Sequence, residues 1–166
     1  DAASDNNFDG VADQTVSVTT ADDDVAGFTI AETNGSTGVD ESGNTDTFTV
    51  VLNAQPTTDV VLSISSSDTG EATATSSLTF TTANWNSPKT VTITGVDDDI
   101  IDGTQNSTIT VSIIDGISDD AFDSVADQTV SVTTADDDVA GFTVTETEGS
   151  TGVSLSLIHI SEPTRQ

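Results

Sequence analysis

The chain has 166 residues and a formal net charge of −27, because 29 aspartate and glutamate residues face only two lysine and arginine residues. It contains no cysteine, which excludes disulfide scaffolds, thiolate metal sites and thiol catalysis. A nucleic acid would be repelled by this charge, and no apolar run approaches the ~20 residues that insert directly into a membrane. A partner that neutralises negative charge is therefore expected.

An internal repeat organises the chain. Residues 11–29 recur without a change at residues 125–143, which is an offset of 114 residues. We therefore expect the C-terminal end of a preceding repeat at 1–24, one complete repeat at 25–138 and the start of the next repeat at 139–153. A unit of this length can bury its own core, so the pattern predicts a tandem array of domains.

Within the complete repeat, hydrophobic and polar residues alternate in seven short runs. Clusters of glycine, asparagine, aspartate and proline separate these runs, and no segment has a helical period. Seven such strands predict an all-β fold, a seven-stranded antiparallel β-sandwich. In chain order the runs are Phe28–Ile30, Phe48–Leu52, Val60–Ile64, Leu78–Phe80, Val91–Ile93, Ile109–Ile113 and Val130–Val132.

The composition changes abruptly after Val153. Residues 155–165 resemble the translation of a common sequencing adapter, so we interpret residues 154–166 as a non-native tail. Without this tail the chain has no histidine, and Lys89 is its one basic residue. Nucleophile–base pairs cannot be assembled from such a set, and we expect no enzymatic activity.

The acidic residues are unevenly distributed over the predicted sandwich. If successive strands alternate in direction, the loops after the first, third and fifth strands share one end with the end of the seventh strand. We call this end the acidic pole. It receives 13 of the 19 acids in residues 25–138: Glu32, Asp40, Glu41, Asp46, Asp68, Glu71, Asp97, Asp98, Asp99, Asp102, Asp136, Asp137 and Asp138.

Carboxylates this dense, without basic partners, repel one another unless a cation enters. Ca²⁺ fits best because it takes 6–8 oxygen ligands in flexible geometry, whereas Mg²⁺ demands stricter geometry. Transition metals favour imidazole or thiolate ligands. The alternative is that the acids form only a solvated surface.

Residues 97–102 (DDDIID) and 135–138 (ADDD) resemble the Calx-beta domain, an immunoglobulin-like calcium-binding module of sodium–calcium exchangers and many bacterial surface proteins. The resemblance covers about residues 25–138 and implies Ca²⁺ as the cofactor. Longer stretches, among them LTFTTANWNSPKTVTITGVDDD, resemble repeats of very large bacterial secreted or cell-surface proteins. The ligands that the resemblance implies are Glu41, Asp97, Asp98, the carbonyl group of Ile100, Asp102, Asp136, Asp137 and Asp138.

Two departures from the family pattern stand out. Gln105 occupies the position of a family glutamate, and the Asp-Tyr pair between the third and fourth strands is absent. Asp68 or Glu71 are weaker substitutes there. The matching acids of the preceding repeat, also weaker candidates, are Asp22, Asp23 and Asp24.

Together these features predict a calcium-binding structural or adhesive repeat of a bacterial surface or secreted protein, located outside the cell. Calcium would stiffen the junctions between repeats, and the partners would be the neighbouring repeats and a cell-surface or matrix ligand. Two alternatives are a glycan- or protein-binding adhesin module and a non-catalytic accessory domain of a large secreted hydrolase.

Overall fold

The computed structural model describes residues 6–8, 10–146, 149 and 152. The interpretation of residues 154–166 as a non-native tail therefore falls outside the described residues, as do parts of the segments 1–24 and 139–153 that we interpret as neighbouring repeats. Within the described part, no helix has the length and hydrophobicity needed to cross a membrane.

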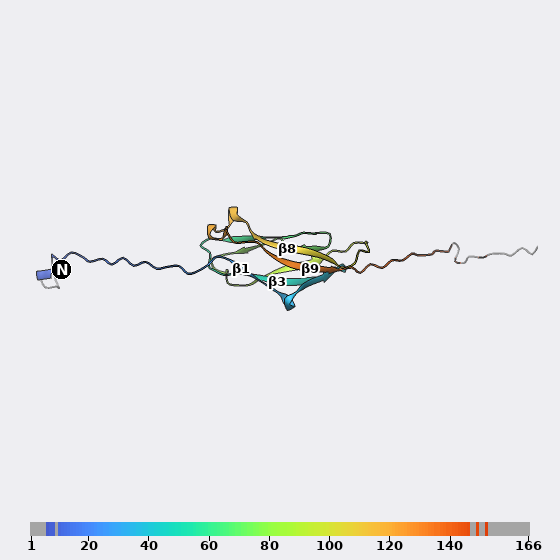
Figure 1. Cartoon of the computed structure of the whole chain (residues 1–166), viewed down its shortest axis with the longest axis horizontal. Coiled ribbons are helices and arrows are strands. Elements are labelled where there is room, and N and C mark those ends of the chain that lie inside the picture. Colours follow the sequence, from blue (N-terminus) through green and yellow to red (C-terminus); the bar gives the residue numbers. More distant parts are fainter. Residues whose placement is uncertain (1–5, 9, 147–148, 150–151, 153–166) are drawn as a thin grey trace, which may run out of the picture.

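Nine strands in the described residues form two sheets (Figure 1). The four-stranded sheet has the order β1 (Phe28–Glu32), β3 (Thr45–Leu52), β7 (Lys89–Gly95) and β5 (Ala72–Ala74). The five-stranded sheet has the order β2 (Thr37–Asp40), β9 (Gln128–Ala135), β8 (Gln105–Ile113), β4 (Val60–Ser66) and β6 (Ser77–Phe80). Short 3₁₀ turns are η1 (Asn6–Phe8), η2 (Thr33–Gly35), η3 (Asp115–Ile117) and η4 (Asp120–Phe122).

The alternation along the strands builds the core between the sheets. Phe48 and Val50 of β3 are fully buried, as are Ile109 and Val111 of β8 in the other sheet. Their neighbours along each strand are at least partly exposed, which is the pattern of a sheet with one buried face. The prediction of an all-β sandwich is confirmed, and each of the seven predicted strands is present.

The structure adds two strands that the sequence did not predict, β2 and β5. They have only four and three residues, too few for an alternating pattern to be recognised. Strand β2 also departs from the antiparallel prediction, because it pairs in parallel with β9, with Thr37 opposite Val132 and Asp40 opposite Ala135. This parallel pair brings the residue after Asp40 to the end of β9.

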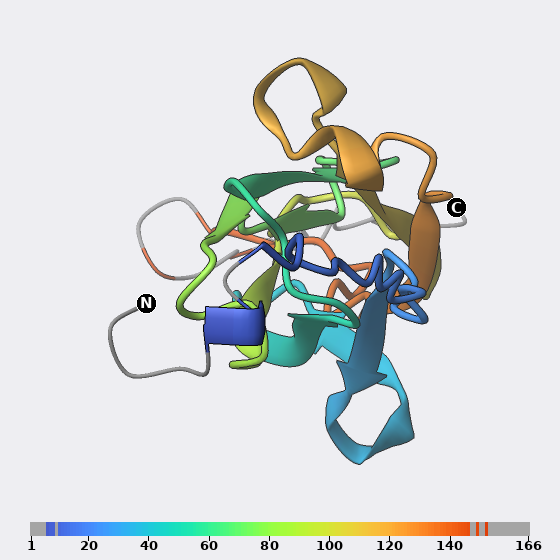
Figure 2. The same ribbon diagram turned by 90° about the vertical axis from the view of Figure 1, so that its left-hand side faces the viewer.

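The two ends of the sandwich are distinct. The N-terminal segment reaches the sandwich at one end and the C-terminal segment leaves at the other (Figure 1). Seen along the long axis, residues 114–124 (gold) project from one side and the turn around η2 (blue) projects from the other (Figure 2).

One peptide occurs in two different environments. Val130 and Val132 of β9 are 3% and 0% exposed, whereas their identical counterparts Val16 and Val18 are 87% and 80% exposed. Residues 14–21 form no strand, although their sequence is that of β9. Burial of these valines therefore depends on pairing with β8 and β2, and not on the peptide itself.

Candidate metal centre

The parallel pairing of β2 with β9 positions Glu41. Its backbone N–H donates to the carbonyl oxygen of Ala135 at 3.2 Å, which continues the ladder by one residue beyond β2. Its side-chain Oε2 accepts a hydrogen bond from the N–H of Asp137 at 3.3 Å. Glu41 is only 1% exposed, so burial raises the pKa of its carboxyl group, and the charge of Asp136 raises it further.

A glycine at the end of β7 permits this arrangement. A Cβ atom at Gly95 would collide with the carbonyl oxygen of Asp40. The absence of a side chain therefore lets β2 approach the end of β7, directly before the acidic run that begins at Asp97.

Asp136 is held by backbone donors. Its Oδ1 accepts a hydrogen bond from the N–H of Asp138 at 2.7 Å, and its Oδ2 accepts one from the N–H of Gly103 at 2.7 Å. These two hydrogen bonds lower the pKa of Asp136. The turn after β9 therefore contains a carboxylate that is fixed in place and favoured in its ionised form.

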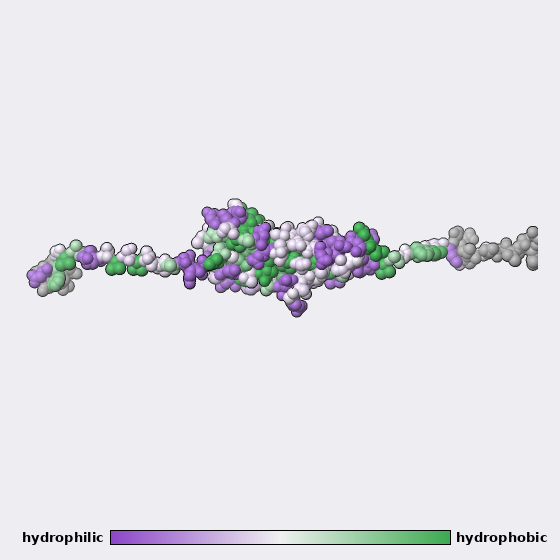
Figure 3. All heavy atoms as spheres, viewed as in Figure 1, coloured by the Kyte–Doolittle hydropathy of each residue, from purple (hydrophilic) through white to green (hydrophobic). Residues whose placement is uncertain are grey.

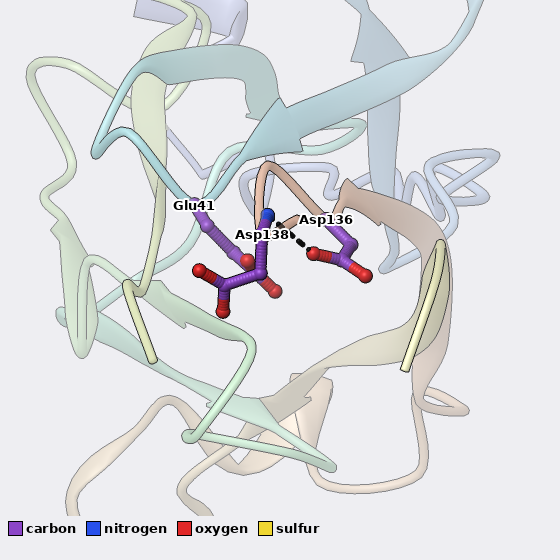
Figure 4. Close-up of side chains that lie close together, drawn as sticks. All are labelled: Glu41, Asp136 and Asp138. Carbon is purple, nitrogen blue, oxygen red and sulfur yellow. Dashed lines mark hydrogen bonds between the residues drawn. The ribbon is translucent and has the colours of Figure 1, made fainter. Parts of the chain in front are cut away.

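Glu41, Asp136 and Asp138 each direct a carboxylate oxygen to one place, with these oxygens all within 4.8 Å of one another (Figure 4). Asp138 Oδ2 is buried and has no hydrogen-bond partner. Burial raises the pKa of Asp138, and the neighbouring charge of Asp136 contributes in the same direction. Oxygens on opposite sides of a Ca²⁺ ion, at 2.3–2.6 Å each, lie about 4.6–5.2 Å apart, so the spacing suits such an ion.

Glu71 lies beside this group, before β5. Its carbonyl oxygen accepts hydrogen bonds from Val96 N–H at 2.9 Å and from Thr134 Oγ1 at 3.3 Å. Its side-chain Oε2 is buried without a hydrogen-bond partner. Burial raises the pKa of Glu71, and the charges of Asp102 and Asp68 add to the effect. Glu71, a weaker candidate in the sequence analysis, thus supplies the second unpartnered carboxylate oxygen of this region, after that of Asp138.

The loop from Asp97 to Asp102 forms a turn held by its own groups. Asp98 Oδ1 accepts from the N–H of Ile100 at 2.6 Å, and the carbonyl oxygen of Ile100 accepts from the N–H of Asp102 at 3.0 Å. Gln105, where the family has glutamate, donates from Nε2 to the carbonyl oxygen of Asp102 at 3.1 Å. Asp98 is close enough to Glu41 to raise its pKa, whereas Asp97 is exposed.

Other acids assigned to the acidic pole have different roles. Glu32 accepts a hydrogen bond from Thr37 Oγ1 at 2.9 Å, and Asp46 accepts one from the N–H of Gly38 at 3.0 Å. Both therefore brace β2 along its length. Asp22 and Asp24, the weaker candidates from the preceding repeat, are exposed and line a cavity with Thr57 and Asp119 at the opposite end of the sandwich.

The chemistry of the centre is that of oxygen ligands and negative charge. In the space-filling view, hydrophilic residues lie at both ends of the sandwich, and a group of hydrophobic residues lies among them at the end from which the C-terminal segment leaves (Figure 3). The one basic residue of the described part, Lys89, has its Nζ 5.3 Å from the centre of the Phe80 ring. Three convergent carboxylates without a basic partner can hold a hard divalent cation.

No protein-family model and no curated protein matches the chain. Among solved structures, the apo form of the Calx CBD1 domain aligns with a TM-score of 0.47 at 17% identity, over 67% of this chain and 98% of that one. The Escherichia coli chaperone DraB gives a TM-score of 0.48 at 10% identity, over 70% of this chain and 59% of that one. The Salmonella enterica SafA pilin–SafB chaperone complex gives a TM-score of 0.43 at 9% identity, over 69% of this chain and 56% of that one.

Proposed function

We propose that the chain belongs to a tandem array in a bacterial surface or secreted protein, and that its complete repeat binds calcium at the acidic pole. The observation that carries this proposal is the convergence of Glu41, Asp136 and Asp138 within 4.8 Å. The module is structural in this proposal and has no catalytic role.

The unpartnered oxygens support a cation over a merely solvated surface. Asp138 Oδ2 and Glu71 Oε2 are both shielded from solvent and lack hydrogen-bond donors. A buried carboxylate oxygen without a donor is costly, whereas coordination to a cation would satisfy it. A solvated acidic surface would leave these oxygens in contact with water.

The ligand set favours calcium among the common cations. The three convergent ligand groups are carboxylates, and the family resemblance adds the carbonyl oxygen of Ile100. They come from loops, which suits the flexible coordination of Ca²⁺ better than the strict octahedron of Mg²⁺. In addition, a site outside the cell works at an affinity of about 10⁻⁴–10⁻³ M, which is typical of extracellular calcium modules.

The position of the centre gives calcium a mechanical role. Asp138 is followed by Val139, Ala140 and Gly141, the short segment that leads toward the next repeat. Without calcium, repulsion among the carboxylates loosens the loops around this exit. With calcium, the loops after β2, β7 and β9 are clamped together, so the direction in which the chain leaves is fixed.

Thermal unfolding of the full chain, with calcium and with a chelator, tests the proposal. A ligand that binds only the folded state stabilises it by about 2.7 kcal/mol when its concentration is 100 times Kd. For a domain of this size, we expect calcium to raise the unfolding midpoint by several degrees or more. Magnesium at the same concentration should have a smaller effect. An unchanged midpoint would favour the solvated acidic surface.

A further inference from the structure

The acidic turn of the metal centre occurs a second time in the chain. In the complete repeat, the N–H of Asp138 donates to Asp136 Oδ1 at 2.7 Å. The equivalent residues, 114 positions earlier, make the same contact, since the N–H of Asp24 donates to Asp22 Oδ1 at 3.1 Å. Residues 22–24 are thus the counterpart, from the preceding repeat, of the turn that supplies two of the three convergent carboxylates.

This second turn lies against the complete repeat. Asp22 and Asp24 line a cavity of about 150 Å³ at the end of the sandwich opposite the acidic pole. The remaining walls come from the residue Ala26 before β1, from the loop between β3 and β4 and from the segment around η4. They are Ala26, Ala54, Gln55, Pro56, Thr57, Asp119, Ala121 and Phe122.

A short connection keeps the turn there. Only Val25, Ala26 and Gly27 separate Asp24 from Phe28, which is 3% exposed in β1. Four Cα–Cα steps span at most about 14 Å. Ala26 also packs against the core. The following repeat begins with the same Val-Ala-Gly-Phe sequence at residues 139–142, so its connection has the same length.

The walls of the cavity are preorganised by Asp119, which is 6% exposed. Its Oδ2 accepts hydrogen bonds from Thr57 N–H at 2.6 Å, Thr57 Oγ1 at 2.7 Å and Thr58 N–H at 2.9 Å, while its Oδ1 accepts one from Ala121 N–H at 3.0 Å. These contacts join the β3–β4 loop to η4 as one rigid surface. These four hydrogen bonds hold the Asp119 carboxylate in place within the wall.

We propose that residues 54–57 and 119–122 form the docking surface for the terminal acidic turn of the preceding repeat. In an array, the equivalent surface of the next repeat then covers Asp136–Asp138, so each metal centre is closed by its neighbour. The counterparts of Pro56 and Asp119 in the next repeat would fall beyond residue 166. The covering role rests on the proposed calcium function, whereas the docking of residues 22–24 stands without it.

Backbone ¹⁵N relaxation of the full chain tests the docking. We expect the amides of Asp22 and Asp24 to be as ordered as those of β3, and those of Ser17 and Thr19 to be mobile. Ala121→Glu places a negative charge in the cavity wall at an exposed position and should make Asp22 and Asp24 as mobile as Ser17. Ala83→Glu adds the same charge at an exposed loop position outside the cavity and should leave them ordered.

Mobile amides at Asp22 and Asp24 in the unsubstituted chain would overturn the docking surface, as would an equal loss of order in both variants. The thermal unfolding experiment separates this outcome from the calcium proposal. Ordered Asp22 and Asp24 without any effect of calcium would leave the docking surface standing and remove the calcium function. Mobile Asp22 and Asp24 with a calcium-dependent unfolding midpoint would remove the docking surface and leave the calcium function standing.

Discussion

Glu41 Oε2 accepts a hydrogen bond from the backbone N–H of Asp137 at 3.3 Å, across 96 residues of sequence. The contact joins the residue that follows β2 to the turn that follows β9. It keeps a carboxylate buried among other carboxylates, where its ionised form is disfavoured. The centre is consequently a place where negative charge is held by the fold at a cost to stability.

Replacement of this carboxylate should have opposite effects with and without calcium. Glu41→Gln keeps the shape and an oxygen that can accept from Asp137, but removes the charge. Because burial raises the pKa of Glu41, the charge opposes folding at pH 7, and the unfolding midpoint in chelator should rise. The increase in midpoint caused by calcium should become smaller, because a ligand is weakened.

Asp127→Asn is the matched control, since it removes one acid at an exposed position at the other end of β9. Its calcium-induced shift should equal that of the unsubstituted chain. An equal reduction in both variants would show that calcium responds to net charge and not to a defined site.

A methyl group at Gly95, which is not itself a candidate ligand, should displace the candidate ligand Glu41 of the metal centre. Gly95→Ala places a Cβ atom against the carbonyl oxygen of Asp40 and forces β2 away from the end of β7. Overpacking of this kind costs about 1–3 kcal/mol, and we also expect a weaker response to calcium because Glu41 moves with β2. Urea unfolding with and without calcium measures both effects. Gly116→Ala, where a Cβ meets no atom within 4 Å, should change neither.

Acid unfolding should reveal the contribution of Asp119. Its hydrogen bonds with Thr57, Ala121 and Thr58 lower its pKa from 3.8 to about 2. A carboxyl group with a lowered pKa stabilises the fold above its unfolded-state pKa, and this stabilisation is lost as the pH falls through the folded-state value. Part of the stability should therefore disappear between about pH 4 and pH 2.

Asp119→Asn provides the comparison for this titration. The variant should be less stable at pH 7, because the amide replaces charge-assisted hydrogen bonds with weaker ones. It should also lose less stability between pH 4 and pH 2 than the unsubstituted chain. If the variant and the unsubstituted chain lose the same stability between pH 4 and pH 2, the loss belongs to other carboxyl groups.

Removal of the exposed N-terminal segment should leave the sandwich intact. Val16 and Val18 are exposed and residues 14–21 form no strand, so they add little to the core. A chain of residues 22–146 should unfold within about 0.5 kcal/mol of the full chain, as expected for changes away from buried features. A larger loss, measured by urea unfolding, would show that residues before Asp22 stabilise the complete repeat.

The sequence predicts the sandwich well because period-two alternation reports directly which side of a strand is buried, as at Phe48 and Val50. From strand direction alone it assigns 13 acids to one end, and three of these, Glu41, Asp136 and Asp138, converge in the structure. It cannot identify Glu41 as the most buried acid, since this depends on the short parallel strand β2. Nor can the sequence predict the unpartnered oxygen of Glu71, because this depends on how the segment before β5 packs against β9.

Residues 11–29 and 125–143 have the same sequence, so they allow the effect of the structural environment on one peptide to be measured within a single chain. Intrinsic amide exchange depends on neighbouring side chains, and within these copies the neighbours are the same. The ratio of exchange rates between Val16 and Val130, or between Val18 and Val132, therefore needs no correction for sequence. It reports, in a single sample, the free energy that a strand gains when it is enclosed between β8 and β2.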